Sequence, residues 1–73
     1  MSFKVGDQVV FLGCSKEQIY WGSNDDPNPI LTINDVYEVS DVDIHSYHTK
    51  ISLTDIPGRF NSVCFDYATQ KEN

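Results

Sequence analysis

The sequence Val-Tyr-Glu-Val-Ser-Asp-Val at residues 36–42 contains the clearest β-strand pattern of the chain. Tyr37 and Val39 alternate with polar side chains, which is the period of a strand with one buried face. Val42 breaks this alternation, so we expect a β-bulge near Asp41, where one extra residue would reset the pattern.

Two other stretches have the same character. Residues 8–12, Gln-Val-Val-Phe-Leu, place Val9 and Phe11 on one face. Residues 49–53, Thr-Lys-Ile-Ser-Leu, carry an apolar side chain at every second position, with Ile51 inward. Both runs are short and rich in β-branched or aromatic residues, as expected for strands.

Turn-forming residues separate these runs. Gly6-Asp7 and Asn34-Asp35 have turn chemistry, and residues 43–48 read as a hairpin loop. Pro57-Gly58 suits the central positions of a type II turn. The stretches Arg59-Phe60 and Val63-Cys64-Phe65 would then form the closing strand or strands. We therefore expect an all-β fold, a small barrel of four to five short antiparallel strands.

The connection Cys14–Pro29 is long and irregular, with two prolines and several turn formers. Within it, Gln18–Trp21 is a short apolar patch that fits either a one-turn helix or a short strand. A connection of this length in a compact domain is more often functional than a short one.

The charge of the chain is acidic and unevenly distributed. Five Lys and Arg stand against eleven Asp and Glu, a net charge of −6, and there is no Lys or Arg between Lys16 and Lys50. Such a field repels phosphate backbones and anionic membranes and attracts basic surfaces. We therefore expect a protein partner with a basic surface, no membrane association and no direct nucleic-acid binding.

The ends of the chain and its two cysteines indicate the cellular compartment and the domain boundaries. The N-terminus has no apolar segment of the signal-peptide type, which predicts a cytoplasmic protein with Cys14 and Cys64 reduced. Strand pairing would bring the two cysteines close, so a disulfide is the alternative. We expect one domain over residues 1–67 and a flexible tail over 68–73.

Several residues have catalytic or metal-binding chemistry but lack its spacing. His45 and His48 beside Asp43 form half a metal site, whereas zinc requires three or four ligands. Cys64 with either histidine would make a nucleophile pair, yet a Cys within an apolar strand is usually a buried hydrophobe. Asp25-Asp26 lack the spacing of an EF-hand. We expect no catalytic residue, no metal and no cofactor.

Aromatic and acidic residues outside the expected core are the candidate binding site. Ring faces and carboxylates both favour cations and basic or proline-rich peptides. We predict that the partner-binding residues are Trp21, Asp25, Asp26, Asp41, Asp43 and Tyr47.

The order of several motifs resembles a known family. Lys4-Val5-Gly6-Asp7, Leu31-Thr32, Val36-Tyr37-Glu38-Val39 and Arg59-Phe60 follow one another as in small SH3-like barrel proteins encoded by bacteriophages. The resemblance covers residues 3 to 67 and extends to KOW-type and Tudor-type modules. This chain departs from the family at Asn34-Asp35, where a glycine-containing turn is usual, and in its longer loop.

The resemblance implies a phage accessory protein, acting in the host cytoplasm, that engages a host or phage macromolecule. It implies no shared catalytic residue. Our hypothesis is a small acidic, non-enzymatic protein-binding module with acidic loops and exposed aromatic residues. The alternatives are a nucleic-acid-binding barrel and a structural or oligomer-forming protein.

Overall fold

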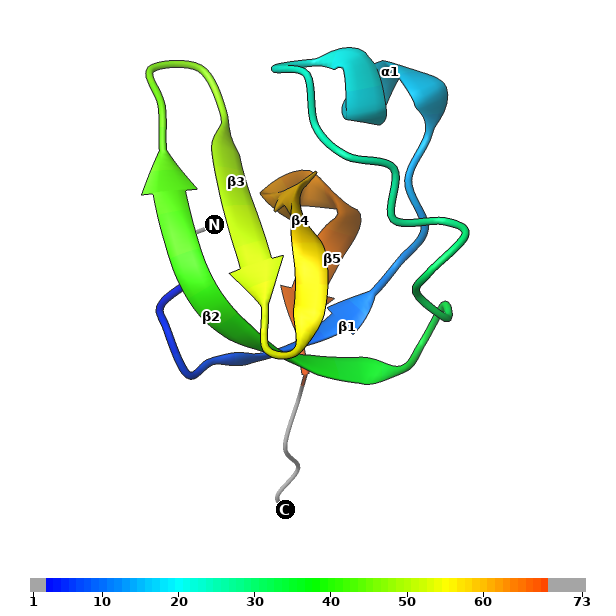
Figure 1. Ribbon diagram of the computed structural model, residues 1–73, viewed down its shortest axis with the longest axis vertical. Coiled ribbons are helices and arrows are strands. Elements are labelled where there is room, and N and C mark those ends of the chain that lie inside the picture. The colour runs from blue at the N-terminus through cyan, green and yellow to red at the C-terminus, as the bar shows by residue number, and fades with distance from the viewer. Residues whose placement is uncertain (1–2, 69–73) are drawn as a thin grey trace.

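The computed structural model describes residues 3–68, and five antiparallel strands dominate this part of the chain (Figure 1). In chain order the elements are β1 (Gln8–Phe11), α1 (Lys16–Tyr20), β2 (Val36–Ile44), β3 (Thr49–Leu53), β4 (Ile56–Asn61), the 3-10 helix η1 (Ser62–Cys64) and β5 (Phe65–Tyr67). The strand order is β4-β3-β2-β1-β5. The prediction of a small all-β domain with one long connection after the first strand is confirmed.

Strand β2 belongs to both halves of the sheet. Its first residues pair with β1, with Val36 opposite Val10, and its later residues pair with β3, with Val42 opposite Ile51. The register shifts between Val39 and Asp41, so the expected bulge near Asp41 is present. Figure 1 shows β2 curving between the two halves, which allows the sheet to wrap around its own apolar face.

The core combines one face of each alternating strand with apolar residues from the neighbouring segments. Val9 and Phe11 of β1 and Ile51 of β3 are at most 1% exposed. The aromatic rings of Phe11 and Phe65 pack with their centroids 5.5 Å apart. The remaining buried apolar residues are Phe3, Leu31, Val39, Leu53, Phe60 and Cys64.

The predicted turn at Pro57-Gly58 is wrong. The turn lies at Thr54-Asp55, because Leu53 pairs with Ile56 and leaves two residues between the strands. Asp55 takes the left-handed conformation with φ 64°, which Asp tolerates better than most residues. Pro57 lies within β4, an edge strand, where a residue without an N–H is accepted.

The closing segment also differs from the prediction of a strand over Val63-Cys64. These residues belong to η1, whose first turn is capped by Asn61: the Asn61 side chain accepts a hydrogen bond from the Val63 N–H at 3.2 Å. The strand begins at Phe65. Ala68, assigned to the tail, still donates its N–H to the Gln8 oxygen at 2.9 Å. The rest of the predicted tail lies outside the described residues.

Candidate functional site

Helix α1 lies within the long connection and is capped at both ends. The Ser15 hydroxyl accepts a hydrogen bond from the Gln18 N–H at 3.2 Å, and the Gln18 side-chain oxygen accepts one from the Ser15 N–H at 2.9 Å. This reciprocal pair is the capping box of a Ser-x-x-Gln sequence. It resolves the open choice at Gln18–Trp21: the chain is helical up to Tyr20, and Trp21 is the C-cap residue.

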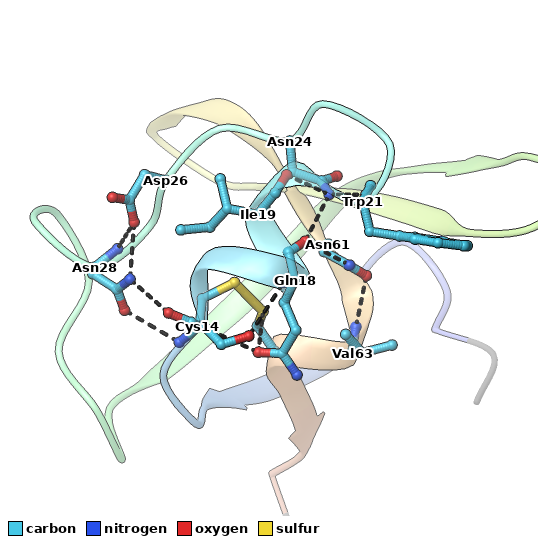
Figure 2. Close-up of a disulfide and its surroundings, with 11 residues drawn as sticks. Cys14, Gln18, Ile19, Trp21, Asn24, Asp26, Asn28, Asn61 and Val63 are labelled. Carbon is cyan, nitrogen blue, oxygen red and sulfur yellow. Dashed lines mark hydrogen bonds between the residues drawn. A yellow bond between two sulfur atoms is a disulfide. The ribbon is translucent and has the colours of Figure 1, made fainter.

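Two asparagines fix the C-terminal end of α1. The side-chain amide of Asn24 donates toward the main-chain oxygens of Gln18, Ile19 and Trp21 at 3.1, 3.2 and 2.6 Å. Asn61, at the end of β4, donates its amide to the Gln18 oxygen at 2.9 Å. Figure 2 shows these contacts. The helix carbonyls that have no partner within the helix are thereby satisfied, and Trp21 is held at a defined place.

A disulfide joins the start of this loop to η1, so the prediction of reduced cysteines is wrong (Figure 2). The Leu12 N–H donates to the Cys64 oxygen at 2.9 Å, which places Cys14, two residues further on, beside Cys64. The Cα atoms of the two cysteines are 5.2 Å apart, a separation that a disulfide can bridge. The prediction relied on cellular compartment, whereas the strand pairing decides the proximity.

An open groove of about 290 Å³ lies between α1 and the β2–β3 hairpin. Trp21 and Tyr47 are 61% and 86% exposed, and the indole N–H of Trp21 points to the Tyr47 main-chain oxygen at 3.5 Å. We call this site the aromatic groove. Its lining residues are Glu17, Gln18, Trp21, Tyr47, His48, Thr49, Asn61 and Val63.

The histidines of the hairpin support one side of the aromatic groove. The rings of His45 and His48 stack with their centroids 4.6 Å apart. Gly22, which follows Trp21, packs directly against the His48 ring. A Cβ at Gly22 would lie 2.7 Å from Nε2 of His48. The His48 side chain of the hairpin therefore packs closely against the main chain of the α1 loop at Gly22.

The acidic residues predicted in the loop make local hydrogen bonds. The Asp25 carboxylate accepts a bond from the Arg59 N–H at 2.8 Å. The Asp26 carboxylate accepts bonds from the N–H and the side-chain amide of Asn28 at 3.0 and 2.9 Å. These carboxylates hold the loop in shape, while both residues remain exposed.

The acidic residues predicted on β2 lie on the outer face of the sheet. Asp43 accepts from Arg59 Nη1 at 3.3 Å and is 3.0 Å from His45 Nε2. Asp41 is exposed and lies opposite Ser52. The predicted binding residues thus separate into the Trp21–Tyr47 pair in the aromatic groove and four carboxylates outside its lining.

Sequence reasoning missed part of the groove. The capping-box sequence Ser-x-x-Gln was visible and would have indicated a helix that presents Glu17 and Gln18. Asn61 and Val63 carry no such signal, because their position depends on η1 and on the disulfide next to it.

Within residues 3–68, no group of three or more His, Cys, Asp or Glu side chains is arranged to hold a metal ion. No helix in this part of the chain is long and apolar enough to cross a membrane.

Comparison with known proteins gave one informative result. A family model described as bacteriophage T4 protein Y07B matches residues 16–73, which includes α1, the aromatic groove and four of the five strands. Searches of curated proteins and of solved structures found no significant match.

Proposed function

This chain belongs to the family of bacteriophage T4 protein Y07B, and from that premise we propose that it is a small non-enzymatic phage accessory protein that binds another protein through the aromatic groove. The observation that carries the proposal is that Trp21 and Tyr47 line the same groove. Two large, exposed aromatic side chains, one directly after α1 and one in the β2–β3 turn, line the same mostly apolar groove, and the Trp21 indole N–H reaches the Tyr47 main-chain oxygen. Trp and Tyr are the residue types most enriched among the anchors of protein interfaces.

The charge around the aromatic groove supports a partner with a basic surface. Glu17 is the charged residue of the lining, and no Lys or Arg of the described chain lines the groove. The protein as a whole carries a net charge of −6. A basic partner would be attracted by this field, and cationic side chains bind favourably against indole and phenol faces.

The carboxylates outside the lining fit a supporting role. Asp41 is exposed on the outer face of β2, whereas Asp43 already contacts Arg59 and His45. Exposed charges at the rim of an interface mainly affect the rate of association and its salt dependence. We therefore assign affinity to Trp21 and Tyr47, and steering to the acidic residues.

The test is affinity capture from a lysate of the bacterial host, followed by titration of the purified partner. Trp21→Ala and Tyr47→Ala are compared with Tyr20→Ala, which removes an aromatic side chain that is 74% exposed but does not line the groove. Loss of an interface anchor costs about 2 kcal/mol or more, roughly 30-fold in Kd. We expect this loss for the two groove variants and native affinity for Tyr20→Ala.

Equal affinity of all three variants would refute the aromatic groove as the binding site. A captured protein whose binding is unaffected by salt would contradict the basic-partner proposal, because steering between exposed charges is screened by salt. Specific binding of nucleic acid in place of protein would favour the alternative function.

A further inference from the structure

The Cys14–Cys64 disulfide connects the two walls of the aromatic groove. Cys14 directly precedes Ser15, the N-cap residue of α1, and Cys64 directly follows Val63, a lining residue on η1. Gln18, which lines the groove, has its Oε1 atom 3.6 Å from the Cys64 sulfur. The bond therefore lies next to the groove and fixes one wall to the other.

The N-terminal end of α1 has few other attachments to the sheet. The helix has five residues, none of them buried, and an isolated helix of this length is not stable in water. Asn28 bonds both main-chain groups of Cys14, at 3.2 and 2.8 Å, but Asn28 belongs to the same long connection and not to the sheet. The Asn61–Gln18 bond and the two Asp25–Arg59 hydrogen bonds to β4 hold the C-terminal end of α1 and the loop beyond it. The disulfide is thus the strongest anchor of the N-terminal end of α1.

Reduction of the Cys14–Cys64 disulfide would free Cys14, which lies in the loop. Two thiol sulfur atoms cannot stay at bonding distance, so one cysteine must move. Cys64 is 1% exposed and belongs to the core, whereas Cys14 is half-buried on the loop. Movement of Cys14 would loosen the N-terminal end of α1 and displace Trp21 and Gly22 from the hairpin, while the Asp25–Arg59 contact keeps the loop beyond them on β4.

We propose that the Cys14–Cys64 disulfide is a redox latch that keeps the aromatic groove assembled when oxidised and releases it when reduced. The functional consequence rests on the proposed function, since the latch would regulate binding at that same site. Bacterial cytosol keeps most thiols reduced, so a phage protein made there meets reducing conditions first. The oxidised form would be the binding-competent one, because the aromatic groove is assembled only in that form.

Reduction of the protein disulfide needs a dithiol, and its re-formation needs the oxidised, disulfide form of such a dithiol. A thiolate of the reductant attacks the half-buried Cys14 sulfur, and the Cys64 sulfur leaves as a thiolate that takes up a proton. The second thiol of the reductant then attacks the mixed disulfide and releases the Cys14 thiol. The reductant gives up two electrons and closes its own disulfide, and the reverse reaction with an oxidised dithiol restores the latch.

The latch can be tested by NMR on the whole chain without any partner. In the oxidised protein, Gly22 and the His48 ring should give a strong proton contact, because a Cβ at Gly22 would lie 2.7 Å from that ring. The Phe11–Phe65 contact in the core serves as the internal control. After dithiothreitol treatment we expect the Gly22–His48 contact to be lost and the Phe11–Phe65 contact to persist.

The double variant Cys14→Ser/Cys64→Ser should give the reduced pattern with or without dithiothreitol. A Gly22–His48 contact that survives reduction would overturn the latch. Loss of the Phe11–Phe65 contact on reduction would overturn it as well, because the disulfide would then hold the whole domain. Two cysteines that alkylate freely in the untreated folded protein would also overturn it. None of these outcomes depends on whether the aromatic groove binds a protein, so the two proposals fail separately.

Discussion

The Asp25 carboxylate accepts a hydrogen bond from the main-chain N–H of Arg59 at 2.8 Å, and the N–H of Asp25 donates to the Arg59 oxygen at 2.9 Å. This two-way contact attaches the long connection to β4, an edge strand of the sheet. An uncovered edge strand offers unpaired main-chain groups to other chains. Asp25 therefore protects the edge while it positions the loop that carries Trp21.

Asp25→Ala should lower the free energy of unfolding by about 1 kcal/mol, because it removes an exposed hydrogen bond to a main-chain donor. For a domain of this size the melting temperature should fall by about 4–8 °C. Asp41→Ala is the matched control, since Asp41 is exposed and its side chain makes no hydrogen bond within residues 3–68. Equal melting temperatures for the two variants would show that the Asp25–Arg59 contact does not stabilise the fold.

The core was predictable from the sequence because alternation is a local property. Counting every second residue puts Val9 and Phe11 on one shared face and predicts that Ile51 points inward, and all three are buried. The bulge near Asp41 was visible for the same reason, as a break in the alternation. Burial of one face of a strand requires an apolar side chain at every second position, and this spacing can be read directly from the sequence.

The turns and the loop were harder to predict, because tertiary pairing outweighs local preference there. Pro57-Gly58 is a good turn sequence, yet β4 includes it because the pairing of Ile56 with Leu53 closes the hairpin earlier. The disulfide joins residues 50 positions apart, and no local pattern encodes that approach. Trp21 and Tyr47 were chosen for exposure and chemistry, but their meeting in one groove depends on the folded loop.

The inward alternation of β3 can be tested with two isoleucines. Ile51 is 0% exposed and Ile44, on β2, is 77% exposed. Ile51→Val should cost about 0.5–1.5 kcal/mol of unfolding free energy, since it removes a buried methyl group and leaves a small cavity. Ile44→Val should change stability by less than about 0.5 kcal/mol. Denaturant titrations would measure both, and a cost for Ile44→Val as large as that for Ile51→Val would mean that the sheet faces are assigned wrongly.

The contact between Gly22 and His48 predicts a specific effect of a single methyl group. Gly22 has φ +88° and Gly6 has φ +93°, so an alanine at either position adopts an unfavourable backbone conformation. A Cβ at Gly6 meets open space, whereas a Cβ at Gly22 would lie 2.7 Å from the His48 ring. Both variants should lose about 1–2 kcal/mol of stability through the backbone conformation, and Gly22→Ala should lose more than Gly6→Ala because its methyl group must also displace the His48 ring.

The two alanine variants should differ at the aromatic groove. Gly22→Ala should push the His48 imidazole off His45 and shift its NMR resonances, while Gly6→Ala should leave them unchanged. Unshifted His48 resonances in the Gly22→Ala variant would contradict the packing of the hairpin on the α1 loop.

Asn61 performs two separable tasks, and two substitutions distinguish them. Its side-chain oxygen caps η1 by accepting from the Val63 N–H, and its amide donates to the Gln18 oxygen of α1. Asn61 is 3% exposed, so a lost partner leaves a buried group without a hydrogen bond. Asn61→Ala removes both contacts and should cost about 1–3 kcal/mol.

Asn61→Asp keeps the capping oxygen and its shape but has no donor for the Gln18 oxygen. At neutral pH it also brings a buried carboxylate close to that oxygen, and burying an unpaired charge is more costly than losing a neutral hydrogen bond. We therefore expect Asn61→Asp to be at least as destabilising as Asn61→Ala in denaturant titrations, although it preserves the cap. If Asn61→Asp were as stable as the native protein, capping of η1 would be the dominant role of Asn61. The Asn61–Gln18 hydrogen bond would then contribute little to holding α1.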